Sequence, residues 1–148
     1  MDRENRSFDG LEGVDSAELI RQGRSVVVDL LIRPPAEVAQ IRARLVGERT
    51  SHAPHLLDVE VTHALRRLLL TGRLTELSAR RALRDFAVMG RKRRPDRALL
   101  GRGLALRDQL TAYDAVYVAV AEVTGPTLLT RDARLARAAG HRARVELV

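Results

Sequence analysis

The sequence predicts an α/β fold with a mainly parallel sheet. Short apolar runs that suit buried strands alternate with longer segments in which apolar residues recur at helical spacing. Glycine or proline separates many of these segments. The length of 148 residues suits one domain. No apolar run approaches the roughly 20 residues that a membrane span needs, and the first residues lack the apolar core of a signal peptide, so we expect no membrane association.

The first third of the chain contains one extension and two predicted elements. Residues 1–24 are polar and weakly periodic, and we expect them to form a loosely attached or disordered extension to a domain at 25–148. Residues 25–29 are predicted to form a buried strand, because three consecutive valines end in an aspartate. A helix is predicted over 35–46, since a proline suits its first turn and apolar residues follow on one face.

The remaining elements continue the alternation. Residues 91–94 form a basic run that suits either a solvated loop or contact with the phosphates of a nucleic acid. Thr111 is a predicted N-cap. The predicted segments are an extended stretch at 51–54, helices at 55–71, 75–89, 96–109, 112–123 and 132–139, and strands at 127–130 and 144–148.

Composition restricts both the chemistry and the partners. With no cysteine, the sequence excludes disulfides, zinc–thiolate sites, iron–sulfur clusters and cysteine nucleophiles, and it suits a reducing cytoplasm. The net charge of +7 favours an anionic partner. Lys92 is the only lysine among 26 basic residues, and arginine suits phosphate recognition. A coding bias explains the choice of arginine equally well, but it does not remove the net charge.

Four acids occupy positions that suit a metal site: Asp29, Glu60, Asp114 and Asp132. Each lies at the end of a predicted element or among apolar residues. Carboxylates that converge repel one another unless a cation lies between them, and oxygen ligands favour Mg²⁺ or Mn²⁺. On spacing alone, simpler explanations are favoured: Asp114 and Asp132 would cap helices, and Glu60 would lie on a solvated edge.

Residues 110–122 carry a more specific pattern. The run Leu-Thr-Ala-Tyr-Asp-Ala-Val-Tyr-Val-Ala-Val-Ala-Glu resembles the most characteristic segment of PIN-domain ribonucleases, in particular the VapC-type toxins of bacterial toxin–antitoxin pairs. Residues 52–61, 128–135 and 145–148 resemble further segments of that family, in the same order. The resemblance covers about 25–148. It implies a PIN-like three-layer α/β/α architecture around a central, mainly parallel sheet.

The resemblance also implies an activity, a metal and partners. Asp29, Glu60 and Asp114 would hold Mg²⁺ or Mn²⁺, and Asp132 would assist in a metal-dependent endoribonuclease. The resemblance further implies an RNA substrate, a cognate antitoxin that wraps the helical hairpin at 56–89, and a homodimer. Residues expected to border the site or to contact RNA are Thr130, Arg131, Arg91, Arg93 and Arg94.

The first acid is where the sequence departs from the family, and three alignments are open. In one, Asp29 ends the first strand and part of the following helix is missing; the valine run favours this alignment. In the ungapped alignment, Asp29 matches a later helical acid, and Gly23 occupies the position of the metal ligand. In the third, Asp15 replaces the missing acid, although no apolar strand precedes it. A damaged first position would leave a PIN-fold protein that binds antitoxin or RNA without cleaving.

Two further groups are expected to have ordinary structural roles. The histidines at 52, 55 and 63 are expected to form local hydrogen bonds, because PIN-type sites use carboxylates. Tyr113 and Tyr117 lie four residues apart on one helical face, and we expect them in the core or at the dimer interface.

Overall fold

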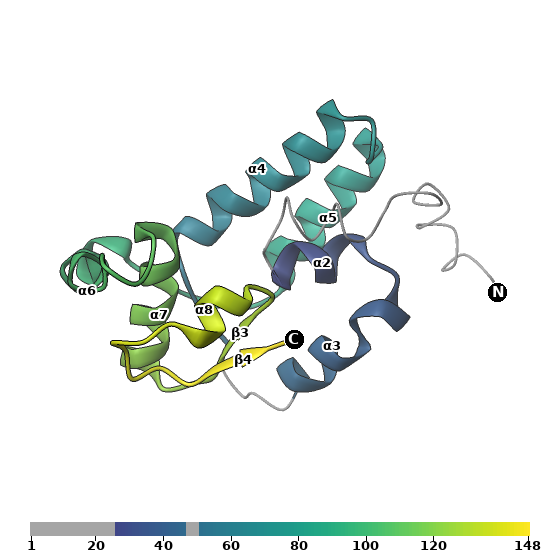
Figure 1. Ribbon diagram of the computed structural model, residues 1–148. Helices are drawn as coiled ribbons and strands as arrows, with labels where there is room; N and C mark the ends of the chain where they lie inside the picture. The colour runs from purple at the N-terminus through teal and green to yellow at the C-terminus, as the bar shows by residue number, and fades with distance from the viewer. Residues whose placement is uncertain (1–25, 47–50) are drawn as a thin grey trace.

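A computed structural model describes residues 26–46 and 51–148 (Figure 1). The extension predicted at 1–24 lies outside the described residues, so the predicted domain boundary stays a prediction. No helix in the described part of the chain is long and apolar enough to cross a membrane. The elements are α2 (Val26–Ile32), η1 (Pro35–Val38), α3 (Ala39–Val46), β1 (His52–Pro54), α4 (Leu56–Leu70), α5 (Glu76–Val88), β2 (Lys92–Arg94), η2 (Asp96–Leu99), α6 (Leu100–Ala105), α7 (Ala112–Thr124), β3 (Leu128–Thr130), α8 (Ala133–Arg137) and β4 (Val145–Leu147).

The strand predicted at 25–29 is wrong, because Val26–Ile32 forms the helix α2. The helix is short and buried on two sides, so its sequence is apolar apart from Asp29 and lacks helical periodicity. Val27, Val28 and Ile32 pack in one core cluster. Val26 and Leu30 pack in another. Packing on both sides thus overrides the preference of valine for strands.

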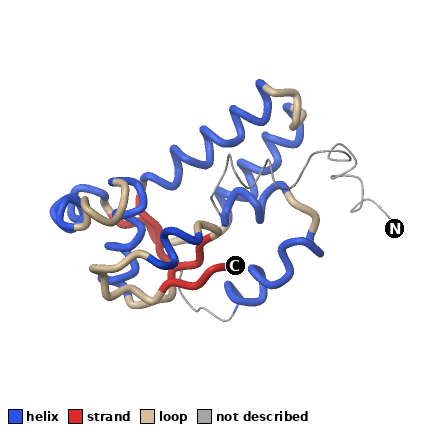
Figure 2. The backbone as a smooth tube through the Cα atoms, viewed as in Figure 1, coloured by secondary structure: helices blue, strands red, loops and turns tan. Residues whose placement is uncertain are grey.

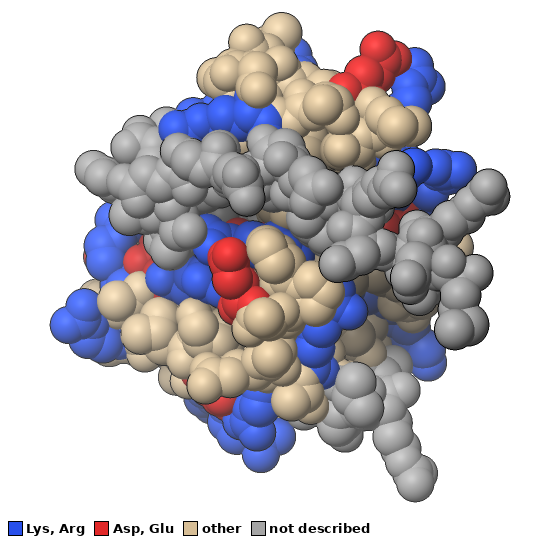
Figure 3. Space-filling model, turned by 90° about the vertical axis from the view of Figure 1, so that its right-hand side faces the viewer, with Lys and Arg blue, Asp and Glu red and all other residues tan. Residues whose placement is uncertain are grey.

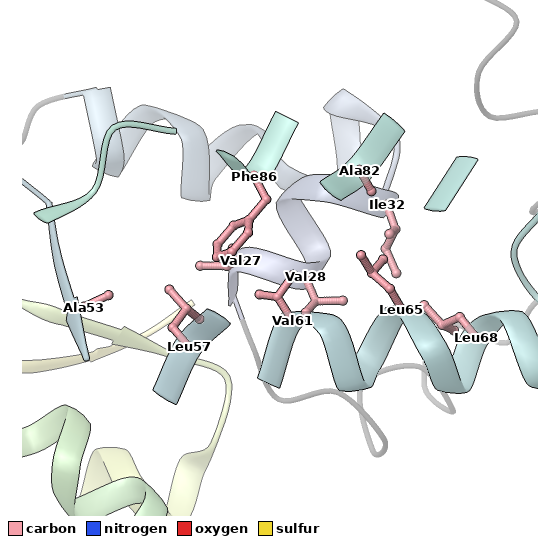
Figure 4. Close-up of a cluster of buried hydrophobic side chains, with 10 residues drawn as sticks. All are labelled: Val27, Val28, Ile32, Ala53, Leu57, Val61, Leu65, Leu68, Ala82 and Phe86. Atoms are coloured by element: carbon pink, nitrogen blue, oxygen red, sulfur yellow. The ribbon is translucent and has the colours of Figure 1, made fainter. Parts of the chain in front are cut away.

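The largest core cluster lies where α2 meets a hairpin of α4 and α5. Figure 1 shows these two long helices side by side, with α2 against them. Leu57, Val61, Leu65 and Leu68 extend from α4 toward α2, and Phe86 of α5 closes the cluster (Figure 4). The predicted helices at 55–71 and 75–89 are confirmed, and Thr75 caps α5 by accepting a hydrogen bond from the Ser78 amide at 3.2 Å.

The strands are short (Figure 2), and they pair in parallel. β1 pairs with β2, and β3 pairs with β4, so the described residues contain two parallel pairs rather than one continuous sheet. The extended segment at 51–54 and the strands at 127–130 and 144–148 are confirmed. The basic run at 91–94 is neither a loop nor a helix: it contributes β2, whose charged side chains suit the edge of a sheet.

α7 connects the two strand pairs. It contacts both β1 and β3, and six of its 13 residues, all in its middle part, are buried. Its predicted N-cap, Thr111, is confirmed, and Gly125 ends it with a φ of 88° that favours glycine. Two other predicted helices end early: 96–109 becomes η2 and α6, and 132–139 becomes α8. Leu106, which ends α6, lies in the core at 2% exposure.

Candidate active site

A cavity of about 790 Å³ opens between α4, α7, β1 and β3. Most of its lining is apolar and comes from these elements and from α2. Three of the four predicted acids line it, namely Glu60, Asp114 and Asp132, together with Thr130. These residues come from three separate parts of the sequence, so the fold brings them to one space.

Asp114 lies in the first turn of α7. Its backbone amide donates to Thr111 Oγ1 at 3.2 Å, and the Thr111 hydroxyl donates to Asp114 Oδ2 at 2.8 Å. Thr111 thus caps α7, and its hydroxyl also orients the Asp114 carboxylate. The N-terminal end of the helix dipole also stabilises the negative charge there. Asp114 is therefore both a helix-start residue and a half-buried carboxylate at the cavity.

Glu60 lies in the second turn of α4, also half-buried. Its Oε2 accepts a hydrogen bond from the Tyr117 hydroxyl of α7. Burial raises the pKa of Glu60, and the negative charges of Asp114 and Asp96 raise it further, while the Tyr117 hydrogen bond opposes the increase. Burial and Glu60 in turn raise the pKa of Tyr117 well above its usual range, so the hydroxyl stays a donor.

Thr130 and Asp132 belong to the bend between β3 and α8. The Asp132 amide donates to Thr130 Oγ1 at 3.0 Å, and Asp132 Oδ1 accepts from the Arg134 amide at 2.8 Å. Asp132 is thus the N-cap of α8, as the simpler explanation from spacing predicted. Both side chains are buried and line the cavity.

Asp29 lies elsewhere. It is on α2, it is 2% exposed, and it is not among the residues that line the cavity. Its two oxygens lie at arginine Nε atoms, Oδ1 2.8 Å from Arg33 and Oδ2 2.7 Å from Arg131. The structure therefore places this candidate ligand in a buried ion-pair group beside the site rather than with the other acids.

The basic residues at 91–94 lie in different environments. Arg91 lines the cavity and donates to Ser51 Oγ at 3.0 Å, and burial and Arg93 lower its pKa. Arg93 is 2.7 Å from Asp58 Oδ1 and lies over the ring of Phe86. Arg94 is exposed on β2. Of this run, Arg91 is thus the member that faces the same space as the acids.

Comparison with known proteins identifies the family. A family model described as "PIN domain" matches residues 24–141. Ribonuclease VapC1 of Mycobacterium tuberculosis is 42% identical over 125 residues, which cover 84% of this chain and 93% of the relative. Ribonuclease VapC12 of the same organism is 38% identical over 124 residues, or 84% and 95% of the two chains.

The chain belongs to the VapC-type PIN-domain family. This agrees with the family resemblance and with the α/β fold that the sequence predicts. The helical state of α2 also agrees with the ungapped alignment to the PIN pattern, which places a helix at these residues. In that alignment Asp29 is the later helical acid, and the first-acid position is Gly23, which lies outside the described residues.

The carboxylates at the cavity of this PIN domain are the type of ligand that a divalent cation binds. Among the described residues, no three acidic or histidine side chains form a group that could hold a metal ion. However, Mg²⁺ usually keeps several waters and needs only one or two carboxylates. Asp114 raises the pKa of Glu60, so the two carboxylates repel each other, and a cation between them would relieve that repulsion. The donor chemistry therefore fits a divalent cation that prefers oxygen ligands.

The sequence did not indicate that Tyr117 belongs to the site of this PIN domain. We expected it in the core or at a dimer interface; it does pack, partly buried, against the core cluster of α2 and α4, and in addition its hydroxyl donates to Glu60. The available signal was its position three residues after Asp114, which puts both on one helical face. His52 and His63 also line the cavity, but no group of potential ligands includes them in the described ranges.

Proposed function

We propose that this chain is a divalent-metal-dependent endoribonuclease that acts as the toxin of a toxin–antitoxin pair. One observation carries the proposal: on a PIN-domain chain, Glu60, Asp114, Asp132 and Thr130 line one cavity. The relatives named above are ribonucleases by name, and their matches cover most of this chain. The reaction is hydrolysis of RNA phosphodiester bonds.

We assign the cation to Asp114 and Glu60. The bond from Thr111 orients the Asp114 carboxylate, and Tyr117 holds Oε2 of Glu60, which makes Oε1 the oxygen that we assign to the metal. When bound, Mg²⁺ or Mn²⁺ would lower the pKa of a water molecule and offset charge on the phosphoryl oxygens. Asp132 and Thr130 border the site and orient groups around it.

Arginines supply the positive field that RNA requires. Arg91 lines the cavity, and the chain carries a net charge of +7. Figure 3 shows Lys and Arg side chains spread widely over one face, where Asp and Glu are sparse. Such a field attracts a polyanion and lets phosphate contacts position it without sequence selection. We place Arg91 next to the substrate, and Arg94 farther along its backbone.

We also propose an antitoxin partner, a homodimer and a cytoplasmic location. The hairpin of α4 and α5 carries exposed apolar side chains, including Leu70, Leu77 and Val88, which suit a protein partner. The lack of cysteine agrees with the cytoplasm. Co-expression with a candidate antitoxin should yield one complex on size exclusion, and Leu77→Asp should weaken it.

The test of the activity uses one carboxylate and a matched control. Asp114→Asn should abolish RNA cleavage and reduce Mn²⁺ binding, while the protein still folds. Asp108→Asn removes an exposed aspartate whose described ion pair with Arg107 spans 3.8 Å, and it should leave both properties intact. Full cleavage by purified Asp114→Asn would refute the assignment.

A second candidate function is binding without cleavage. The pairing of Asp29 with Arg33 and Arg131 favours it, because a buried acid shared by two arginines is a poor metal ligand. The ungapped alignment then leaves the first-acid position as Gly23. Calorimetry of the wild type with Mn²⁺ decides between them: no binding supports the degenerate protein, and binding that depends on Asp114 supports the nuclease.

A further inference from the structure

A group of four charged side chains, three of them largely buried, connects α2 to the bend after β3. Asp29 lies 2.8 Å from Arg33 and 2.7 Å from Arg131, and Arg33 lies 3.0 Å from Glu37. The side chains of Asp29, Arg33 and Arg131 are 2%, 6% and 15% exposed. Two carboxylates therefore balance two guanidinium groups; Asp29 and Arg33 are buried and Arg131 nearly so, whereas Glu37 is 47% exposed.

Such a group needs a reason beyond stability. Burying charges costs several kcal/mol of solvation, and apolar side chains of similar volume often serve as well. A buried ion pair is therefore better evidence for a fixed geometry than for a large stabilising energy. The ion pairs of Asp29 fix the geometry of the bend that contains Arg131.

Arg131 separates two residues of the candidate site. Thr130 and Asp132 both line the cavity, whereas Arg131 does not. The chain bends at Arg131, between the end of β3 at Thr130 and the extended residue Asp132, so the Arg131 side chain takes a different direction from its two neighbours. With its guanidinium group held on Asp29, Arg131 thus keeps the side chains before and after it directed at the cavity.

We propose that Asp29 is a positioning residue, not a metal ligand: it anchors Arg131 on α2 and so holds Thr130 and Asp132 at the metal site. The effect on metal binding rests on the proposed function, whereas the anchoring of Arg131 by Asp29 does not. Without Asp29, the guanidinium group of Arg131 loses its buried partner. The acids of the cavity then become its alternative partners, and a guanidinium group there competes with a cation for the same oxygens.

Mn²⁺ calorimetry on Asp29→Asn, Arg131→Gln and the double variant tests the role. Asp29→Asn should weaken Mn²⁺ binding by about tenfold or more, as loss of a group that orients ligands does. Adding Arg131→Gln should restore part of the affinity, because the displaced guanidinium group no longer competes with the cation while the bend still lacks its anchor. Equal loss in Asp29→Asn and in the double variant, with Arg131→Gln binding normally, would make Asp29 a ligand and overturn the proposal. Unchanged affinity in Asp29→Asn would also overturn it.

Hydrogen exchange tests the anchor without any metal. Asp29→Asn should speed amide exchange at 130–135 and leave α5 unchanged. Glu37→Gln is the matched control, since it removes a charge from the same group without touching Arg131, and exchange at 130–135 should stay at the wild-type rate. If Asp29→Asn does not fold, Arg131→Gln replaces it in this measurement with the same expected result. Unchanged exchange overturns the anchor, whereas a wild type that binds no Mn²⁺ overturns only the proposed function.

Discussion

The Tyr117 hydroxyl donates a hydrogen bond to Glu60 Oε2 and so joins α7 to α4, the two helices that bring carboxylates to the cavity. The two residues are 57 positions apart in the chain. Because Tyr117 follows Asp114 by three residues, one face of α7 both supplies an acid and orients a second one. The relation between these two helices therefore sets the relation between the two carboxylates.

Tyr117→Phe removes this donor and keeps the ring. We expect weaker Mn²⁺ binding by about tenfold, because the Glu60 carboxylate loses the group that orients it. Tyr113→Phe is the control, since Tyr113 is 64% exposed on the same helix, and it should bind Mn²⁺ like the wild type. Calorimetry compares the two. Equal affinity in both variants would show that the hydrogen bond does not orient a ligand.

Thr111→Ala separates the helix cap from the site. It should cost about 1 kcal/mol of stability through the lost cap of α7 and also weaken Mn²⁺ binding, because Asp114 loses its hydroxyl partner. Thr75→Ala removes the corresponding cap of α5, away from the acids, and should cost a similar amount of stability with no change in metal binding. Urea unfolding and calorimetry measure both effects. A parallel loss of metal binding in both variants would mean that stability, not orientation, controls it.

The pair of Glu122 and Arg102 predicts a pH dependence of stability. Arg102, at 2.7 Å, and the backbone amide of Arg142 lower the pKa of Glu122 to about 2. Since the folded pKa lies below the unfolded value, this stabilisation is complete above about pH 4.5 and is lost as the pH falls toward about 2. Glu122→Gln should melt below the wild type at pH 7, and the difference should close as the pH falls through this range. A constant difference down to pH 2 would contradict the pairing.

Two leucines on α4 test the core. Leu65 is 4% exposed and Leu70 is 69% exposed. Leu65→Ala should lower the free energy of unfolding by about 2–4 kcal/mol, because it leaves a cavity between α4 and α2. Leu70→Ala should cost less than about 0.5 kcal/mol, since its side chain already meets solvent. Chemical denaturation measures both, and similar values for the two would contradict the packing of α2 on α4.

Local signals in the sequence predicted elements such as α7 well. A threonine cap, an apolar stretch and a glycine–proline stop act within a few residues, so the sequence around α7 contains both its start and its end. β2 was missed as a strand because its three residues are charged, and its strand state depends on pairing with β1, some 40 residues earlier.

α2 shows the limit of periodicity. A helix buried on two opposite sides has no polar face, so its sequence cannot be told from that of a buried strand. The same error affected the predicted site, because a strand at 25–29 would have placed Asp29 at the edge of a sheet. As a helix, the segment places Asp29 one turn before Arg33, which is what permits their pairing. The contact of Tyr117 with Glu60 depends on two distant helices, and no local rule predicts it.

The position of Arg131 between two cavity residues also constrains how this sequence can vary. An uncharged residue at position 29 leaves a buried arginine without its counter-charge, and an uncharged residue at position 131 leaves part of a buried acid without one. Each single change is costlier than the pair of changes together. Among related chains, positions 29 and 131 should therefore change together, and a chain that has lost the acid at 29 should carry no arginine at 131.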